Sequence, residues 1–532
     1  MSDELSNLLT QFQRNLENVK NVATARSALS SLLPHQPGYA KNPNDYNLNR
    51  AIGIFLAGSA ETLAHAEPFL IKAVNENRDD EHRPKLLESM ARVFDAGGDI
   101  ERACLVLREA AQFTPSLYRD LAHALLRLGD EKSASEIYNT ILEILDELAV
   151  EKARELGREI TQLLWPNRVT CSRFGELSHA VDVYIKARKL GLTPKVKAIL
   201  TTRSEWVCNK VLLEYWHEQH PGEITILTDP VDVAEMEETY ERCELDMHIF
   251  RLADDRVLHT NWASPEIWAL WEDAGGGPLL KLRDDHRQKG ADWLQQRGMP
   301  KDAWFAALHV REPGYHAETG STWDDNQHRD GRIEDYLQTI KAITDRGGWV
   351  VRIGDPSMTP LPDMAQVIDY AVSTDRAEEL DIFFCAAAKF MVAVSSGGLA
   401  VANVFGTPIV GVNMFPPGDP PFSHRDLYIP KLFRRRDTGK YLNAAEMVAP
   451  PRRLMQSPRY YEEHGLEVIS NTPEEIREAV EEMMARLNGE FHMTDDDQEN
   501  IRRFRDLNDY RGIRIASAPT ASFLRRYPHL VE

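Results

Sequence analysis

The feature that most constrains the fold is a change of pattern at Pro166-Asn167. Before this point apolar residues recur at helical spacing. Beyond it, short apolar runs rich in β-branched residues alternate with amphipathic helical stretches. Such alternation is typical of a parallel sheet with helices on both faces. We therefore predict an all-α region followed by two Rossmann-like, doubly wound α/β domains.

The helical part contains an internal repeat. From Leu87 to Pro115, small residues and a Gly-Asp turn follow the spacing of a tetratricopeptide repeat. The pattern returns in shortened form from Tyr118 to Ile141, and a weaker helical pair is predicted between Ala51 and Ala73. We predict a tetratricopeptide-like region. It either binds a protein partner or is a plain helical cap on the α/β domains.

The α/β part divides into two halves. The predicted strands of the first half are 168–172, 196–201, 224–228 and 247–252, with helices at 177–190, 206–219 and 231–242. The predicted strands of the second half are 305–310, 349–353, 366–370, 390–394 and 408–412, with helices at 332–346, 377–388 and 399–405. Thr472-Pro473-Glu474-Glu475 predicts the capped start of a later helix.

These patterns give four predicted segments. They are a helical region over 1–165, an acceptor-side domain over 166–280, a donor domain over 281–490 and a C-terminal part over 491–532. In the last part, a helix at 499–509 is predicted to cross back to the first half.

Charge and composition exclude several classes. The chain has 62 Lys and Arg against 83 Asp and Glu in 532 residues, a net charge of −21, which excludes a nucleic-acid polymer as partner. Its five cysteines form no CxxC pair and fit a reducing cytosol. The polar N-terminus does not look like a secretory signal, and the apolar stretch 383–412 is broken by polar and turn residues. We expect a cytoplasmic protein.

The most informative motif is VSSGGLA at 394–400, where a strand ends and a helix begins. Backbone N–H groups at a helix start bind anions, glycines allow close approach, and hydroxyls add donors. Ser395, Ser396, Gly397 and Gly398 are therefore candidate phosphate ligands, with a diphosphate as the natural guest. The alternative is an ordinary turn in which a serine caps the helix.

Two other strands end in arginine motifs. Arg311 in HVREP should emerge at the same sheet edge as the serine-glycine turn, where its guanidinium would clamp a diphosphate. The alternative is a structural pair with Glu312. Arg352 and Asp355 in VRIGDP also end a strand, and Asp355 would either accept from a sugar hydroxyl or cap its own loop.

The comparable place in the first half is the turn SRFGELSH. Gly175 lets the chain turn into a helix, and Arg173, Glu176 and His179 would line the cleft from the acceptor side. No GxGxxG follows the first strand and no GxxxxGK[ST] is present, which argues against a dinucleotide-dependent oxidoreductase and a P-loop phosphotransferase.

Together these motifs resemble a known family. The R-x-G-x-L turn, H-V-R-E, V-R-x-G-D and S-S-G-G-L-A followed by G-T-P are similar to a bacterial family of glycosyltransferases, in which tetratricopeptide-like helices precede a GT-B core. The H-V-R and serine motifs are also similar to those of fucosyltransferase-like GT-B enzymes. The resemblance covers residues 168–530 and is strongest over 308–412. It implies that Arg311 binds the nucleotide diphosphate and that Ser395, Ser396 and Gly397 bind phosphate.

One position departs from the family. Glu176 stands where the family turn commonly reads G-H-L, which leaves the acceptor side and any base there open.

The reaction implied is transfer of a sugar from a nucleotide-diphosphate donor to an acceptor hydroxyl or amine. Arg311 and the helix-start amides would stabilise the leaving diphosphate. A base must take the acceptor proton, and the candidates are Glu312, His309, His316 and Glu176. GT-B enzymes generally use positive groups in place of a metal, so the resemblance implies neither a metal nor a cofactor.

The partners follow from this reaction. We expect a cell-surface glycan precursor as acceptor, with at most peripheral contact to the inner membrane through the basic run 434–436. The long polar loop 313–330 is either a lid or a mobile insertion. The alternatives are a protein O-glycosyltransferase that recruits its acceptor through the helices, another nucleotide-sugar enzyme such as an epimerase, and a non-catalytic scaffold.

Overall fold

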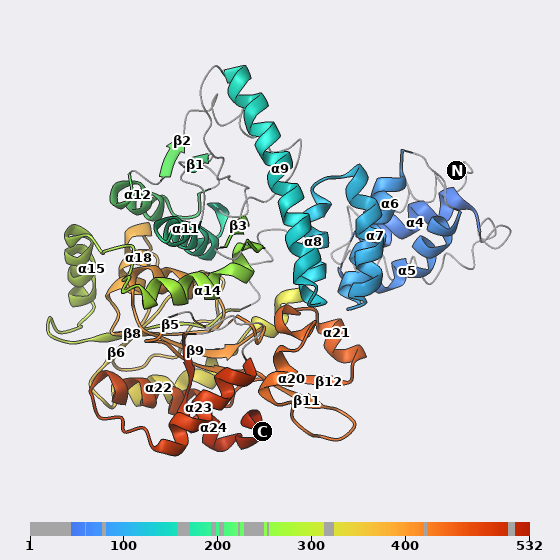
Figure 1. Cartoon of the computed structure of the whole chain (residues 1–532). Coiled ribbons are helices and arrows are strands. Elements are labelled where there is room, and N and C mark those ends of the chain that lie inside the picture. Colours follow the sequence, from blue (N-terminus) through green and yellow to red (C-terminus); the bar gives the residue numbers. More distant parts are fainter. Residues whose placement is uncertain are drawn as a thin grey trace. The chain divides into compact units, whose positions relative to one another are not determined.

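The computed structural model describes residues 44–58, 60–76, 81–156, 171–192, 198–201, 207–221, 224–227, 249–252, 255–312, 324–419, 421, 423–508 and 516–532. The chain divides into two compact units. The first contains the described residues up to Ile137 together with 324–326 and Ser457–His464. The second contains most of the rest, from Tyr138 onward (Figure 1).

The first unit is all helical, which confirms the predicted N-terminal helical region. Its helices are α4 (Tyr46–Ala57), α5 (Ala60–Asn75), α6 (Arg83–Ala96), α7 (Ile100–Phe113), α8 (Leu117–Arg127), the start of α9 (Glu131–Leu156) and α21 (Pro458–Glu463). Among α4 to α8, α4 packs on α5, α6 on α7 and α7 on α8.

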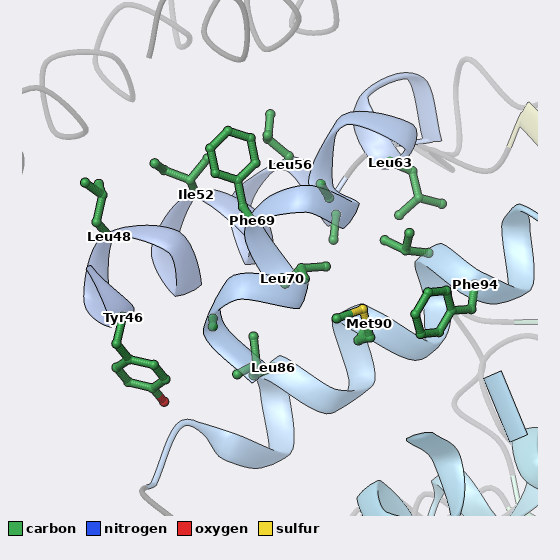
Figure 2. Close-up of a cluster of buried hydrophobic side chains, with 14 of the residues drawn as sticks. Tyr46, Leu48, Ile52, Leu56, Leu63, Phe69, Leu70, Leu86, Met90 and Phe94 are labelled. Carbon is green, nitrogen blue, oxygen red and sulfur yellow. The ribbon is translucent and has the colours of Figure 1, made fainter. Parts of the chain in front are cut away.

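Apolar side chains of α4, α5 and α6 form one buried cluster (Figure 2). Ile52, Leu70 and Leu86 are almost fully buried in it. Gly53 allows α4 and α5 to approach, since a Cβ at this position would lie 2.6 Å from Cδ2 of Leu70. A small residue thus allows close helix packing within the weaker helical pair predicted between Ala51 and Ala73.

The same turn joins α6 to α7 and α8 to α9. Gly98 and Gly129 end the first helix of each pair with φ of 74° and 81°, in the left-handed region that favours glycine. Asp99 and Asp130 then cap the next helix, each accepting at 3.1 Å from the N–H three residues ahead. This recurrence supports an internal repeat, and its likeness to tetratricopeptide repeats stays a prediction.

The second unit is built on a seven-stranded parallel sheet, which confirms the predicted mixed α/β class. In order across the sheet, the strands are β13 (Ala518–Pro519), β10 (Leu427–Pro430), β9 (Ile409–Met414), β8 (Phe390–Ala393), β5 (Phe305–His309), β6 (Trp349–Arg352) and β7 (Val367–Asp369). The five strands predicted for this half match β5 to β9 to within two residues at each end.

Helices cover this sheet, and Figure 1 shows α18 and α22 on opposite sides of it. The helices of this half are α15 (Asp284–Gln296), α17 (Leu337–Thr344), α18 (Glu378–Ala387), α19 (Gly397–Phe405), α20 (Ala444–Val448), α22 (Pro473–Leu487), α23 (Asp495–Asn508) and α24 (Ala521–Arg526). The short 3₁₀ helices are η3 (Asp324–Arg329), η4 (Ile333–Tyr336), η5 (Arg452–Leu454) and η6 (Pro528–Val531). Strands β8 and β9 are buried along their whole length, as central strands of a covered sheet should be.

The first half is described in part. Its elements are α11 (Phe174–Lys189), β1 (Ala198–Thr201), α12 (Lys210–Gln219), β2 (Ile224–Leu227), β3 (Ile249–Arg251), β4 (Val257–His259) and α14 (Thr260–Asp273). Strands β1 and β2 pair in parallel, as predicted, whereas β3 and β4 pair antiparallel. Cys171 and Ser172, predicted to end a strand, are helical. The predicted helix 231–242 lies outside the described residues.

Five strands were not predicted: β4, β10, β13 and the antiparallel pair β11 (Leu432–Arg435) and β12 (Leu466–Ile469). Helix α23 packs on α20, α24, η6 and β13, all in the second half, whereas the sequence predicted that it would cross back to the first half. None of the helices that the structure describes is long and apolar enough to cross a membrane.

The capping box predicted at Thr472 is present at the start of α22. The Thr472 hydroxyl accepts from the Glu475 N–H at 3.3 Å, and the Glu475 carboxylate accepts from the Thr472 N–H at 2.8 Å. We expect Thr472→Ala to lower the free energy of unfolding by about 1 kcal/mol, measured by chemical denaturation. Ser116→Ala is the matched control, because Ser116 holds the same position at α8 but its hydroxyl makes no capping hydrogen bond. Equal stability of the two variants would contradict this.

Candidate anion-binding site

The candidate site lies where the strand order of the sheet reverses. From β5 the chain builds outward through β6 and β7 on one side, and through β8, β9 and β10 on the other. His309 of β5 pairs with Ala393 of β8 at the carboxyl edge. Open α/β sheets bind ligands outside the carboxyl ends of such a pair of strands. The predicted HVR and serine-glycine motifs follow these two strands.

Helix α19 begins at this edge without a side-chain cap. Its N-cap residue, Ser396, is extended and its hydroxyl makes no hydrogen bond to the helix. That hydroxyl oxygen is buried and has no hydrogen-bond partner, and no acidic residue lies in the first turn. The first amides of a helix have no partners inside the helix and carry partial positive charge. The start of α19 is therefore suited to an anion.

A second helix start meets the first. A Cβ on Gly175 would lie 2.8 Å from the Cα of Gly397, and a Cβ on Gly397 would lie 2.8 Å from the N of Gly175. Helix α11 also begins without a side-chain cap, at Arg173. Two positive helix ends thus lie together, with Glu176 as the acidic residue in the first turn of α11. An anion between them would relieve this repulsion.

Arg329, at the end of the loop that follows β5, contacts the turn that follows β8. Its Nε and NH2 groups donate to the carbonyl of Ser395, at 3.0 and 2.6 Å. Burial lowers the pKa of Arg329, while the charges of Asp419 and Glu176 raise it. A guanidinium held on the residue that leads into α19 is well placed to share a ligand with the helix start.

Arg311 lies nearby and is paired with Asp330. The two largely buried side chains form an ion pair, and the Arg311 carbonyl accepts from the Gly331 N–H at 2.9 Å. Burial lowers the pKa of Arg311, Asp330 raises it, and Arg329 lowers it as a like charge. The sequence left open a structural ion pair between Arg311 and Glu312. In the structure Arg311 pairs with Asp330, and Glu312 pairs with Arg352.

His309 packs on the glycine turn as a neutral ring. A Cβ on Gly398 would lie 3.6 Å from its Cγ. Burial, followed by the charges of Arg352 and Arg311, lowers the pKa of His309 to about 4. Its buried Nδ1 has no hydrogen-bond partner. At neutral pH this imidazole is therefore uncharged.

Glu312 and Arg352 hold each other in the protein interior. The fully buried Arg352 donates to Glu312 at 2.6 Å and to Asp369 at 3.3 Å. The second Glu312 oxygen accepts from the N–H and hydroxyl of Thr359, both at 2.9 Å. Asp355 accepts from the Ser357 N–H at 2.9 Å in a local turn. These three predicted site residues therefore support the loops beside the site.

The remaining predicted site residues differ in how close to the site they lie. His179 lies one turn into α11, where its Nε2 is 2.8 Å from the Ser264 hydroxyl of α14. The Ser395 hydroxyl accepts from the Phe415 N–H at 3.4 Å. His316 lies outside the described residues. The site brings together Arg173, Gly175, Glu176, His309, Arg311, Ser395, Ser396, Gly397 and Gly398.

Three charged residues were missed. Asp330 pairs with Arg311, Asp419 is a buried carboxyl whose pKa is raised by burial and lowered by Arg329, and Lys431 is a buried amine whose pKa is lowered to about 8 by burial. Arg329 was noted only as part of the polar loop 313–330. None of these lies at a predicted strand end, so spacing gave no signal for them.

The basic run 434–436 is largely neutralised. Arg434 pairs with Glu467 at 2.6 Å, and Arg435 pairs with Glu446 at 3.0 Å. This leaves little charge to attract a lipid surface. Among the described residues, no three His, Cys, Asp or Glu side chains are placed to hold a metal ion.

No protein-family model and no curated protein matches the chain. Among the solved structures that are similar to it are two glycosyltransferases. One is the ADP-heptose lipopolysaccharide heptosyltransferase II of E. coli, with 15% identity over 61% of this chain and 98% of that chain, and a TM-score of 0.35. The other is a glycosyl transferase family 9 protein from Veillonella parvula, with 10% identity over 61% and 96%, and a TM-score of 0.36. TM-scores this low establish neither a shared fold nor a shared function.

Proposed function

We propose that the chain is a metal-independent glycosyltransferase of the GT-B type, which moves a sugar from a nucleotide-diphosphate donor to an acceptor hydroxyl or amine. The meeting of two helix N-termini beside two arginines, at the reversal point of the sheet, carries this proposal. The position favours a ligand, and the local charge favours an anion. A diphosphate offers enough oxygens to engage both helix starts and both guanidinium groups.

The arrangement suits departure of a diphosphate. As the bond between the sugar and the diphosphate breaks, negative charge grows on the leaving oxygen. Arg311, Arg329 and the first amides of α19 are already in place before this charge develops. Donors fixed in advance in a partly buried site stabilise such charge strongly.

Glu176 is the carboxylate that fits the base role best. It lies in the first turn of α11 and interacts electrostatically with Arg329. Glu312 is fully engaged by Arg352 and Thr359, and His309, with its pKa lowered to about 4, is a weak base. We therefore assign proton removal to Glu176, and hydrogen bonding to the ligand to His309.

We propose a cell-surface glycan precursor as the acceptor. A protein acceptor is the second candidate, because α7 carries two large apolar side chains on its surface. Leu105 and Phe113 are 69% and 47% exposed. Release of free nucleoside diphosphate with a glycan fraction, but not with protein, would favour the first candidate.

The direct test is a thermal-shift screen of GDP-, UDP- and ADP-linked sugars, with a CMP-linked sugar as the monophosphate control. A ligand at 100 times its Kd adds about 2.7 kcal/mol to the free energy of unfolding. We expect stabilisation by one diphosphate-linked sugar and transfer from it to an acceptor. No shift with any of them would overturn the proposal. Binding without transfer would favour the scaffold.

Arg311 provides the matching mutational prediction. Arg311→Ala removes one guanidinium together with the ion pair that it makes with Asp330. We expect nucleoside diphosphate binding, measured by calorimetry, to weaken by about tenfold to a hundredfold. Unchanged affinity would show that the donor does not bind here.

A further inference from the structure

Two cysteines outside the proposed chemistry lie side by side in the first half. Cys171 precedes α11 and Cys208 precedes α12, and the Cys208 N–H donates to the Cys171 carbonyl at 2.9 Å. Because one backbone hydrogen bond joins the two residues, their Cα atoms lie within about 7 Å of each other, the distance beyond which a disulfide cannot close.

We propose that Cys171 and Cys208 are a reversible redox pair, which forms a disulfide between the segments leading into α11 and α12. No disulfide joins Cys171 to Cys208 in this structure. Burial raises the pKa of the Cys208 thiol, and the nearby Cys171 thiol raises it further.

The two thiols differ in their exposure to solvent, and this difference decides which of them reacts first with an oxidant. Cys208 is an exposed residue although its sulfur lies in a largely buried environment, whereas Cys171 is buried as a whole. With a low-molecular-weight disulfide as oxidant, the Cys208 thiolate attacks one oxidant sulfur and releases one small thiol. The Cys171 thiolate then attacks Cys208 in this mixed disulfide and releases the second small thiol. Two protein thiols are oxidised, one small disulfide is reduced, and the two protons pass to the released thiolates.

The reaction should be slow at neutral pH. The pKa of Cys208 is raised to about 12, first by burial, so little thiolate is present at pH 7. The rate of disulfide formation should rise by about tenfold per pH unit in the range well below this pKa. The pair should therefore form its disulfide slowly, under strong or prolonged oxidation.

The cross-link would connect two structurally important helix starts. Cys171 lies four residues before Gly175, which touches Gly397. Cys208 lies just before the first amides of α12, where the N–H groups of Lys210 and Val211 donate to the Glu378 carboxylate at 2.5 and 3.1 Å. Oxidation would fix the chain that leads into the anion site to the start of α12.

The test uses the full-length chain and oxidised glutathione at pH 7.5 and 8.5. Remaining thiols are alkylated, and the digested protein is analysed by mass spectrometry. We expect a Cys171–Cys208 peptide that dithiothreitol removes, formed about tenfold faster at the higher pH. Cys171→Ser and Cys208→Ser should each abolish it. Cys104→Ser and Cys385→Ser are matched controls and should leave it unchanged.

Three results would overturn the proposal. One is a lasting glutathione adduct on Cys208 while Cys171 is still alkylated. Another is a disulfide that joins either residue to a different cysteine. The third is a Cys171–Cys208 link that forms only after the chain is unfolded in urea. Circular dichroism of the two serine variants checks that loss of the link does not come from misfolding.

Discussion

Replacing Arg329 with alanine is expected to weaken nucleoside diphosphate binding by about tenfold to a hundredfold. A hydrogen bond to a charged group contributes about 1.5–3 kcal/mol, and each 1.4 kcal/mol is a factor of ten in affinity. Arg329 also donates twice to the Ser395 carbonyl, so the variant loses the group that fixes the turn into α19. Calorimetric titration with the diphosphate identified by the screen measures the effect.

Two further variants separate a ligand contact from a structural role. Arg332→Ala is the matched control, because Arg332 is a nearby arginine with an exposed side chain that pairs with Glu334. It should bind like the wild type. Arg329→Lys keeps the charge but loses the two-pronged geometry, and it should bind with intermediate affinity. If Arg329→Ala lowers the melting temperature but binds normally, Arg329 is structural and does not contact the ligand.

Gly397→Ala should lower both the free energy of unfolding and the affinity for a diphosphate. The new Cβ would lie 2.8 Å from the backbone N of Gly175, a contact that requires the two helix starts to separate. Overpacking of this kind costs about 1–3 kcal/mol. Since the backbone has to move where the ligand is expected, diphosphate binding should fall with stability. Urea denaturation and calorimetry measure the two effects.

The chain offers a control and a consistency check for this variant. Gly277 lies in open space, with no heavy atom within 4 Å of an added Cβ, so Gly277→Ala should be near neutral. Gly175→Ala meets the Cα of Gly397 and should behave like Gly397→Ala. Because both changes act on one contact, the double variant should cost less than the sum of the two single variants. Wild-type binding by Gly397→Ala would disprove close approach at the site.

The central strands and the serine-glycine turn could be read from the sequence because their signals are local. Short runs of five or six residues predicted β5 to β9, and glycines at 397 and 398 marked the helix start. Strand β13, with two residues, has no such signal. Its pairing with β10 depends on how the C-terminal part of the chain, about ninety residues after β10, folds back onto the sheet.

The structure brings some of the predicted site residues together and keeps others apart. Arg352 ends a strand as predicted, but its partner Glu312 lies forty residues away on the neighbouring loop, and no spacing reveals that pair. His179 shares a helix with Gly175 but lies one turn further along, facing Ser264. Arg329 and Asp330 lie at the end of a polar loop whose sequence shows no periodicity. The contacts of Arg329 with Ser395 and of Asp330 with Arg311 depend on the tertiary structure, so no sequence pattern signalled them.

The contact between Gly175 and Gly397 has a consequence for how the protein is held together. It joins helices from two distant stretches of chain, and each contributes a positive end. If the proposed anion binds there, it connects the two helix starts, and its concentration then affects how firmly α11 stays on α19. Each tenfold rise above the Kd adds about 1.4 kcal/mol to that attachment. Resistance of the α11 segment to proteolysis should therefore follow the supply of donor in the cell.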